Sequence, residues 1–403
     1  APNGLQADLQ LTGFGGALSV LLDEGTVAPL TVNFSEIGVS PLMTLLGNAP
    51  MNGTLSAALN VTKSDNQTNA TLTGRLSDLT VPQSKANPVS FDLTGAFDAQ
   101  GGKINLRTPD QQMLQAIADI ATPLRTLPAL PYLAYDADKP GLITAKLDGP
   151  IDNISAVFLP DTQTVKGVTN TELTIPLPFA ANQITGRMSF KDGLFQHETL
   201  GADLEKINFN IGLKGGDISL SDFSAIGRKG GTLTGSGGVN FANTLESNLA
   251  LKADRLVVVS RKEAKAVASG TLGMDLTGEN IQIIGDLTIN EGLFRLDSLP
   301  SSSAPTLNVQ FDDEEDIQKS KAPLVSLNLK IGAPRSFKLE GSGMDAEISF
   351  DTNLTGTSSA PNLTGSADIV RGRFELLGKR FEFQESEIEF RGDPMQARLN
   401  IVA

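Results

Sequence analysis

Alternation of apolar and polar side chains is the sequence feature that most constrains this fold. Every second residue of segment 206–213 is apolar, and the pattern returns at 327–331. Near the C-terminus the alternating apolar residues are Phe381, Phe383, Ile388 and Phe390. Successive side chains of a β-strand point to opposite faces of the sheet. The pattern therefore predicts an antiparallel sheet with one apolar face and one water-facing face.

The composition excludes several classes of function. The 403 residues include 40 Gly and 19 Phe, with no Cys, no Trp and a single histidine, His197. A net charge of −14 disfavours nucleic acid, whose phosphates require Lys and Arg, and disfavours adsorption to an anionic membrane by charge alone. A chain without Cys has no disulfide, thiol nucleophile or Cys-ligated zinc. We therefore expect no enzyme, no cofactor, no metal site and no nucleic-acid partner.

Two segments carry helical signals. Thr108 offers an N-cap before Pro109, and apolar residues at helical spacing follow until Pro123. These apolar residues are Met113, Leu114, Ile117, Ile120 and Ala121. A shorter helix is expected between Ser40 and Gly47. The proline-rich segment 123–140 predicts an irregular connection, and segment 300–323, with the acidic run 312–316, predicts an extended excursion.

A glycine motif recurs along the chain. In 184–195 a Gly is followed seven residues later by a second Gly and two residues after that by Phe. Further copies occupy 283–294 and 363–374, with a weaker one at 93–104, at spacings of roughly 80–100 residues. We interpret each copy as a hairpin: a strand, a tight turn that needs Gly at positive φ, and a return strand that begins at an aromatic residue.

Together these patterns predict an all-β chain built as an elongated, curled, solenoid-like antiparallel sheet with a hydrophobic interior and one or two short helices. Strands of about six to eight residues would span roughly 20–26 Å. The expected organisation is β-repeats over 1–107, an amphipathic helix and proline-rich connection over 108–140, more β-repeats over 141–280, and a C-terminal β domain over 281–403.

The last part of the chain resembles a known family. The segments 341–345, 361–365 and 371–374 are followed by Gly378–Phe381, 390–394 and the ending 399–403. In this order they resemble the C-terminal TamB domain over about the last 130 residues, whereas the first 280 residues share only the style of glycine-bounded strands. Met344 stands where the family usually has Leu.

The resemblance implies a "repeating β-groove", or β-taco, of the AsmA-like type. Such proteins lie in the periplasm of Gram-negative bacteria and are tethered to the inner membrane by an N-terminal anchor, which is missing from this sequence. They conduct phospholipid to support outer-membrane biogenesis, and they act with an Omp85-type outer-membrane barrel (TamA-like) as a translocation and assembly module. The family's sequence continues past Ala403, so we expect the C-terminal domain to be truncated at its end.

The candidate site is the apolar face, where side chains would exclude water around lipid tails. The predicted lining residues are Met188, Phe190, Phe195, Phe209, Ile211, Leu287, Ile289, Phe294, Leu296, Ile369, Phe374, Leu376, Phe381, Phe383, Ile388 and Phe390. The same face could instead be the core of a closed sandwich. Two other functions stay open: a scaffold or chaperone for outer-membrane proteins that acts through exposed strand edges, and a secreted β-helix enzyme or adhesin. The latter would require repeated carboxylate clusters, which the sequence lacks.

Overall fold

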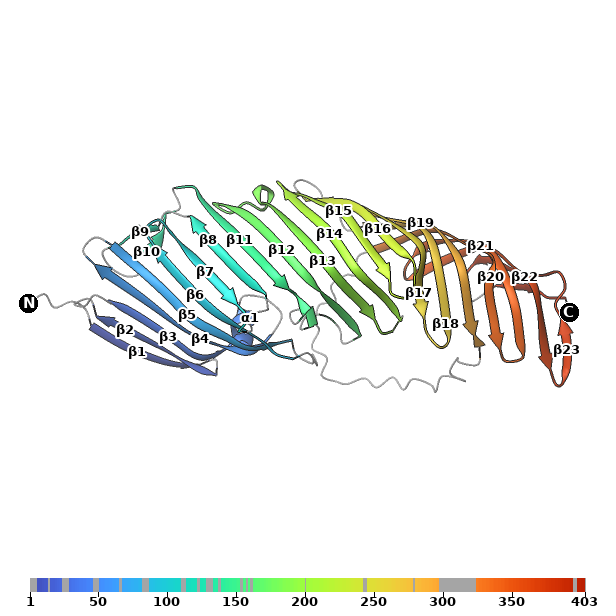
Figure 1. Ribbon diagram of the computed structural model, residues 1–403, viewed down its shortest axis with the longest axis horizontal. Helices are drawn as coiled ribbons and strands as arrows, with labels where there is room; N and C mark the ends of the chain where they lie inside the picture. Colours follow the sequence, from blue (N-terminus) through green and yellow to red (C-terminus); the bar gives the residue numbers. More distant parts are fainter. Residues whose placement is uncertain are drawn as a thin grey trace, which may run out of the picture. The chain divides into compact units, whose positions relative to one another are not determined.

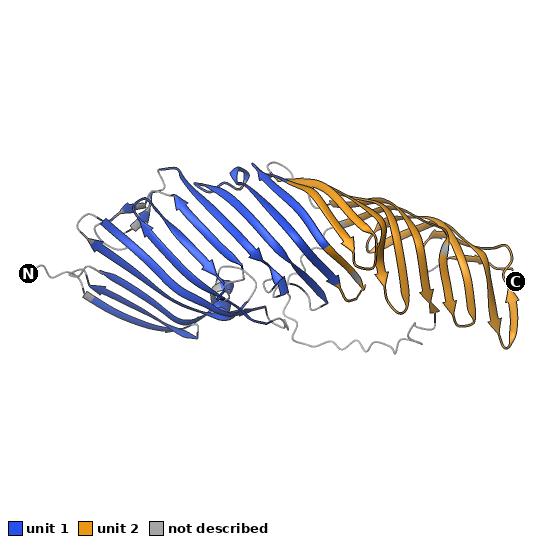
Figure 2. Ribbon diagram, in the orientation of Figure 1, with its two compact units in different colours: residues 1–196, 206–218 blue, residues 197–205, 219–403 orange. Residues whose placement is uncertain are grey.

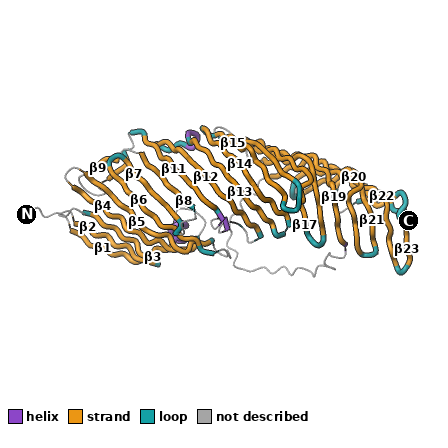
Figure 3. The backbone as a smooth tube through the Cα atoms, viewed as in Figure 1, coloured by secondary structure: helices purple, strands orange, loops and turns teal. Residues whose placement is uncertain are grey.

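The computed structural model describes residues 6–13, 15–23, 29–45, 51–64, 67–81, 87–109, 114–121, 124–127, 133–136, 139–152, 155–156, 159, 162–199, 201–241, 245–277, 280–296, 324–393 and 397–402. Strands make up almost all of them (Figure 3). The all-β class is therefore confirmed.

The chain divides into two compact units (Figure 2). Unit 1 comprises residues 1–196 and 206–218, and unit 2 comprises residues 197–205 and 219–403. The division passes through three strands, β13 (Thr185–His197), β14 (Ala202–Lys214) and β15 (Asp217–Gly227).

Unit 1 is an antiparallel meander in which consecutive strands lie side by side (Figure 1). Its first eight strands are β1 (Gln6–Gly13), β2 (Gly16–Asp23), β3 (Leu30–Gly38), β4 (Asn52–Ser64), β5 (Gln67–Thr80), β6 (Val89–Asp98), β7 (Gly101–Arg107) and β8 (Gln115–Ala121). The sheet continues from β8 to β11 (Gly141–Pro150) and β12 (Gln163–Leu177). The short strands β9 (Leu124–Thr126) and β10 (Leu133–Tyr135) form a separate pair, and a 3₁₀ turn, η1, occupies Ala181–Gln183.

Unit 2 continues with β16 (Thr232–Asn240), β17 (Glu246–Ser260), β18 (Ala264–Thr277), β19 (Asn280–Arg295), β20 (Leu324–Gly341), β21 (Met344–Thr357) and β22 (Ala360–Leu376). All neighbouring pairs from β16 to β22 are antiparallel except β19 and β20, which are parallel. The two halves of β22 then pair with different strands, β23 (Lys379–Glu382) and β24 (Ser386–Gly392), and β25 (Arg398–Asn400) adds to β24.

The shorter predicted helix is confirmed as α1 (Val39–Leu45), which packs against β4. The longer one, expected from Thr108 to Ala121, is wrong. Residues 115–121 form β8, which pairs with β7 on one side and β11 on the other, while residues 110–113, Met113 among them, lie outside the described part of the chain. Two flanking strands that each offer a ladder of hydrogen bonds outweigh the local helical preference.

The hairpin interpretation of the glycine motif is also wrong for three of its four copies. Each of these copies lies within one continuous strand, β13, β19 or β22, and neither Gly193, Gly292 nor Gly372 has a positive φ. Between the two glycines of the second and third copies lies a β-bulge, seen as a register shift beside Ile289 and beside Ile369. Strands therefore reach 18 residues, in β20, rather than six to eight. Only the weaker copy at 93–104 is a hairpin, formed by β6 and β7.

The excursion expected at 300–323 lies outside the described residues. The four-segment organisation of the chain stays a prediction.

Candidate functional site: the apolar face of the sheet

Strand register assigns each side chain of unit 2 to a face, because residues paired directly across antiparallel strands point the same way. Met344 pairs with Phe374 and Phe374 with Phe381, which makes an apolar row. One residue along, Asp345 pairs with Arg373 and Arg373 with Glu382, which makes a charged row. We call the first side the apolar face and the second the polar face.

The register places the predicted lining residues within the strands of unit 2 on this apolar face. They are Leu287, Ile289 and Phe294 of β19, Ile369, Phe374 and Leu376 of β22, Phe381 of β23, and Ile388 and Phe390 of β24. Phe383 follows the end of β23, and its N–H donates to Gly372 O over 3.0 Å, which continues the register to the same face. Leu296 lies beyond the end of β19, and its place on this face stays a prediction. The contact of all these residues with lipid also stays a prediction.

In unit 1 the predicted residues lie on β13 and β14. The rings of Phe190 and Phe209 stack with centroids 5.0 Å apart, and Phe190 is buried. Met188, Phe195 and Ile211 are half-buried. The prediction omitted the first half of the chain, where Leu22, Leu30, Val61 and Ala70 form a buried cluster on one face of β2 to β5. In β4 and β5 Ala57, Ala70 and Gly74 share the apolar positions, so the alternation of large side chains is weaker there.

The apolar face belongs to a sheet whose strands lie beside their hydrogen-bonded neighbours. Among the described elements, the closest backbone contacts join such neighbouring strands, apart from the contact of α1 with β4. Within this sheet Ala333, Ala346 and Ile369 are almost fully buried. Such burial arises where side chains of one face crowd together, which happens when the sheet bends towards that face.

β-bulges supply the bend. In unit 2 the unpaired residues Arg255, Asn290, Arg335 and Val370 lie at similar levels along β17, β19, β20 and β22, and we call them the bulge row. A bulge bends its strand and increases the local twist. Because the bulges are aligned, the bends add up to one fold line across these strands.

Left-handed backbone conformations accompany the bulges. Arg255 and Arg335 in unit 2 have positive φ, as do Glu36, Asp78 and Asp192 in unit 1. Such a residue turns its N–H away from the ladder, and in four cases the N–H finds a side-chain acceptor on the next strand. These bonds join Glu36 to Ser56, Asp78 to Ser90, Asp192 to Asn208 and Arg255 to Ser269.

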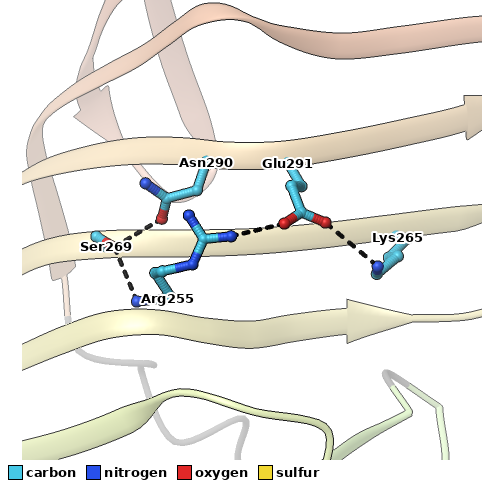
Figure 4. A network of polar contacts seen from close by, with 5 residues as sticks. All are labelled: Arg255, Lys265, Ser269, Asn290 and Glu291. Carbon is cyan, nitrogen blue, oxygen red and sulfur yellow. Dashed lines mark hydrogen bonds and ion pairs between the residues drawn. The ribbon is translucent and has the colours of Figure 1, made fainter.

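Figure 4 shows the bulge row at its most connected point. The Arg255 N–H donates to Ser269 Oγ over 2.8 Å, and the Ser269 hydroxyl donates to Asn290 Oδ1 over 2.6 Å. The Arg255 guanidinium and Lys265 Nζ both contact the Glu291 carboxylate, at 2.7 and 3.5 Å. Three strands are thereby tied together where they bend.

Glycines and aromatic rings share the concave side of these bends. A Cβ at Gly292 would lie 2.2 Å from Phe337 Cδ2, and one at Gly193 would lie 2.4 Å from Phe190 Cε1. Gly193 and Gly292 are therefore needed for space rather than for a turn. A ring lies over each of them and fills the gap that a missing side chain would leave in the apolar face. Gly372 instead faces the backbone of β21, where its Cβ would lie 2.7 Å from Ala346 Cα.

The polar face carries cross-strand ion pairs. The Glu172 carboxylate on β12 forms ion pairs with Lys146 Nζ of β11, at 3.3 Å, and with Arg187 Nη2 of β13, at 2.9 Å. The hydrogen bond from Lys146 is the largest cause that lowers the pKa of Glu172. On β24, the hydrogen bond from Arg391 lowers the pKa of Glu389. Exposed pairs of this kind contribute little stability but favour one strand register over its alternatives.

One hollow of about 840 Å³ lies in unit 2 across neighbouring strands. Its lining mixes polar and apolar residues, among them Ser236, Ala250, Ile284 and Asn328. Across the described ranges, no group of three or more His, Cys, Asp or Glu side chains could hold a metal ion. Nor is any helix there long and apolar enough to span a bilayer. The apolar face remains the feature with the clearest binding chemistry.

The fold and this face define a class: long, bulged β-sheet proteins with one continuous apolar face. The family comparison makes the identification specific, because residues 221–403 match the TamB C-terminal domain. The chain thus carries a TamB domain, which confirms the resemblance and extends it well beyond the last 130 residues. The domain places the chain in the context of outer-membrane assembly and lipid transport. No curated protein and no solved structure matches the chain.

Proposed function

We propose that the chain is a non-enzymatic carrier that conducts phospholipid along its apolar face, between the inner and outer membranes of a Gram-negative bacterium. The observation that carries the proposal is an apolar face that continues from strand to strand in unit 2, with large side chains such as Leu376 and Phe381 exposed on it. Each CH₂ of an acyl chain moved from water onto such a face gains about 0.8 kcal/mol. The contact is non-directional, so it holds a lipid tail and still lets it slide.

The proposal includes a location and partners. The chain would act in the periplasm, tethered to the inner membrane through an N-terminal anchor, and would meet an Omp85-type barrel protein (TamA-like) at the outer membrane. The TamB domain supports this setting. No cofactor enters the proposal, because carriage along a surface breaks no covalent bond.

A second candidate is a scaffold for assembly of outer-membrane proteins. The observation that favours it is β1, which pairs with β2 alone among the described strands and therefore offers a free edge. Edge strands accept a further strand from another polypeptide by main-chain hydrogen bonds.

A photo-crosslinking residue at Phe383, with a separate variant at Glu382, tests the transport proposal in cells. These neighbours differ in face, since Glu382 pairs with Arg373 on the polar face. We expect phospholipid adducts at position 383 and none at 382, detected by mass spectrometry of the purified protein. Adducts of position 383 to unfolded outer-membrane proteins, without lipid, would overturn the carrier and support the scaffold. Equal lipid labelling at both positions would also count against a lipid path restricted to one face.

A further inference from the structure

The tip of the β22–β23 hairpin breaks the usual rules for a turn. Leu376 pairs with Lys379, which leaves a two-residue loop of Leu377 and Gly378. Both loop residues have positive φ, at 51° and 75°, as a type I′ turn requires. Asn or Gly normally fills the first of these positions, because a bulky side chain is strained there. Leu377 occupies it and is 95% exposed.

The surroundings of Leu377 are amphipathic. Leu376 and Phe381, which flank the tip on the apolar face, are also exposed, at 50% and 38%. Lys379 and Arg380 lie directly beyond the turn and are exposed, and neither forms an ion pair with any described residue. Glu375 is opposite Arg380 in register and is the nearest carboxylate on the same hairpin.

We propose that this hairpin tip docks into the surface of a lipid bilayer that carries anionic headgroups. Leu377 would enter the boundary between headgroups and acyl chains, with Leu376 and Phe381 beside it. Lys379 and Arg380 would contact the phosphates. An exposed apolar residue next to unpaired cations is the complement of such a surface.

Charge at two scales supports a local contact. The chain as a whole carries −14 and is repelled by an anionic surface, so adsorption without orientation is disfavoured. Lys379 and Arg380, which form no ion pair with a described residue, oppose this repulsion locally at the turn. This contact also accounts for Leu377 at a strained position. Its backbone conformation costs energy and its side chain packs against nothing in the sheet, whereas in the bilayer the side chain contacts lipid. The docking goes beyond lipid carriage and does not depend on it.

The absence of Trp from the chain gives a direct test. Leu377→Trp places a single fluorophore at the tip, and Ser359→Trp places one in the β21–β22 turn as a matched control. The full chain is mixed with vesicles of equal parts phosphatidylglycerol and phosphatidylcholine, or of phosphatidylcholine alone. We expect a blue-shifted emission and protection from iodide only for the Leu377→Trp variant and only on the anionic vesicles. No shift in that variant, or an equal shift in both variants, would overturn the proposal.

Further variants separate docking from a structural role. Lys379→Gln and Arg380→Gln should each weaken vesicle binding about fivefold, measured by co-sedimentation. Leu377→Asn should weaken it at least about tenfold, yet leave the protein at least as stable to denaturant, because Asn suits a type I′ turn. A Leu377→Asn variant that is less stable and still binds vesicles would contradict the proposal and make Leu377 a structural residue.

Discussion

Glycines on the apolar face matter because the absence of a side chain leaves room for a neighbouring ring. Gly292 lies beneath Phe337, and Phe337 in turn contacts Phe350 edge to face at 5.7 Å. The glycine therefore lets one ring lie flat over the bend and reach its aromatic partner on the next strand. The sequence indicated a repeated spacing of Gly and Phe within the chain, but the ring that covers Gly292 comes from another strand, so the contact itself was not predictable from the repeat.

Gly292→Ala should destabilise unit 2 by about 1–3 kcal/mol, because the new methyl group would collide with the Phe337 ring and force the ring to move. Urea denaturation followed by circular dichroism measures the change. Gly273→Ala, on the polar face of β18, is the matched control, since its Cβ would meet no atom closer than 3.8 Å. We expect this control to be neutral or slightly stabilising. Equal losses in both variants would show that the ring over Gly292 is not the cause.

At the scale of elements, ion pairs couple neighbouring strands where side-chain packing is weak. Glu172 of β12 links β11 through Lys146 and β13 through Arg187. Because its pKa is lowered in the folded state, Glu172 adds stability that is present above its unfolded pKa and lost as the pH falls through its folded pKa.

Glu172→Gln should therefore lower the stability of the protein at pH 7 and change it less and less as the pH falls below 4.5, the ordinary pKa of the carboxyl group. Urea denaturation of both proteins across this range measures the difference. A carboxyl-carbon NMR titration tests the cause: Lys146→Gln should raise the pKa of Glu172 more than Arg187→Gln does, since Lys146 is the larger influence. A difference in stability that persists unchanged at low pH would contradict the linkage.

Elements also show where prediction from the sequence succeeds. Alternation predicted the all-β class correctly, because a period of two follows from strand geometry alone. The prediction from the sequence failed at 115–121, where the spacing of Ile117 and Ile120 suits a helix. These residues form a strand because β7 and β11 offer backbone hydrogen bonds on both sides. The prediction failed again at the bulges, since Asp192 or Arg255 in a strand gives no local sign that its φ is positive. The bulge row, and hence the bend, depends on partners distant in sequence.

At the scale of the whole molecule, the open face has a thermodynamic consequence. The chain exposes 25176 Å². A compact protein of 42.4 kDa would expose about 15,000 Å². The folded chain thus keeps more surface in water than a compact protein does, and exposed side chains such as Leu9, Leu11 and Phe381 show that part of this surface is apolar. Unfolding therefore newly exposes only the surface that is buried in the folded state.

The heat capacity of unfolding should consequently fall below the roughly 12–15 cal/mol/K per residue of globular proteins, because this quantity grows with the apolar area newly exposed to water. Differential scanning calorimetry of the lipid-free protein over several pH values measures it. Repetition with bound phospholipid supplies the comparison, and the value should rise, since lipid tails cover the face before unfolding and leave it afterwards. A lipid-free value within the globular range would mean that the apolar face is already covered in solution. A low heat capacity of unfolding that rises when phospholipid is bound would show that the apolar face accounts for the difference from globular proteins. This is the face that we propose binds the lipid tails.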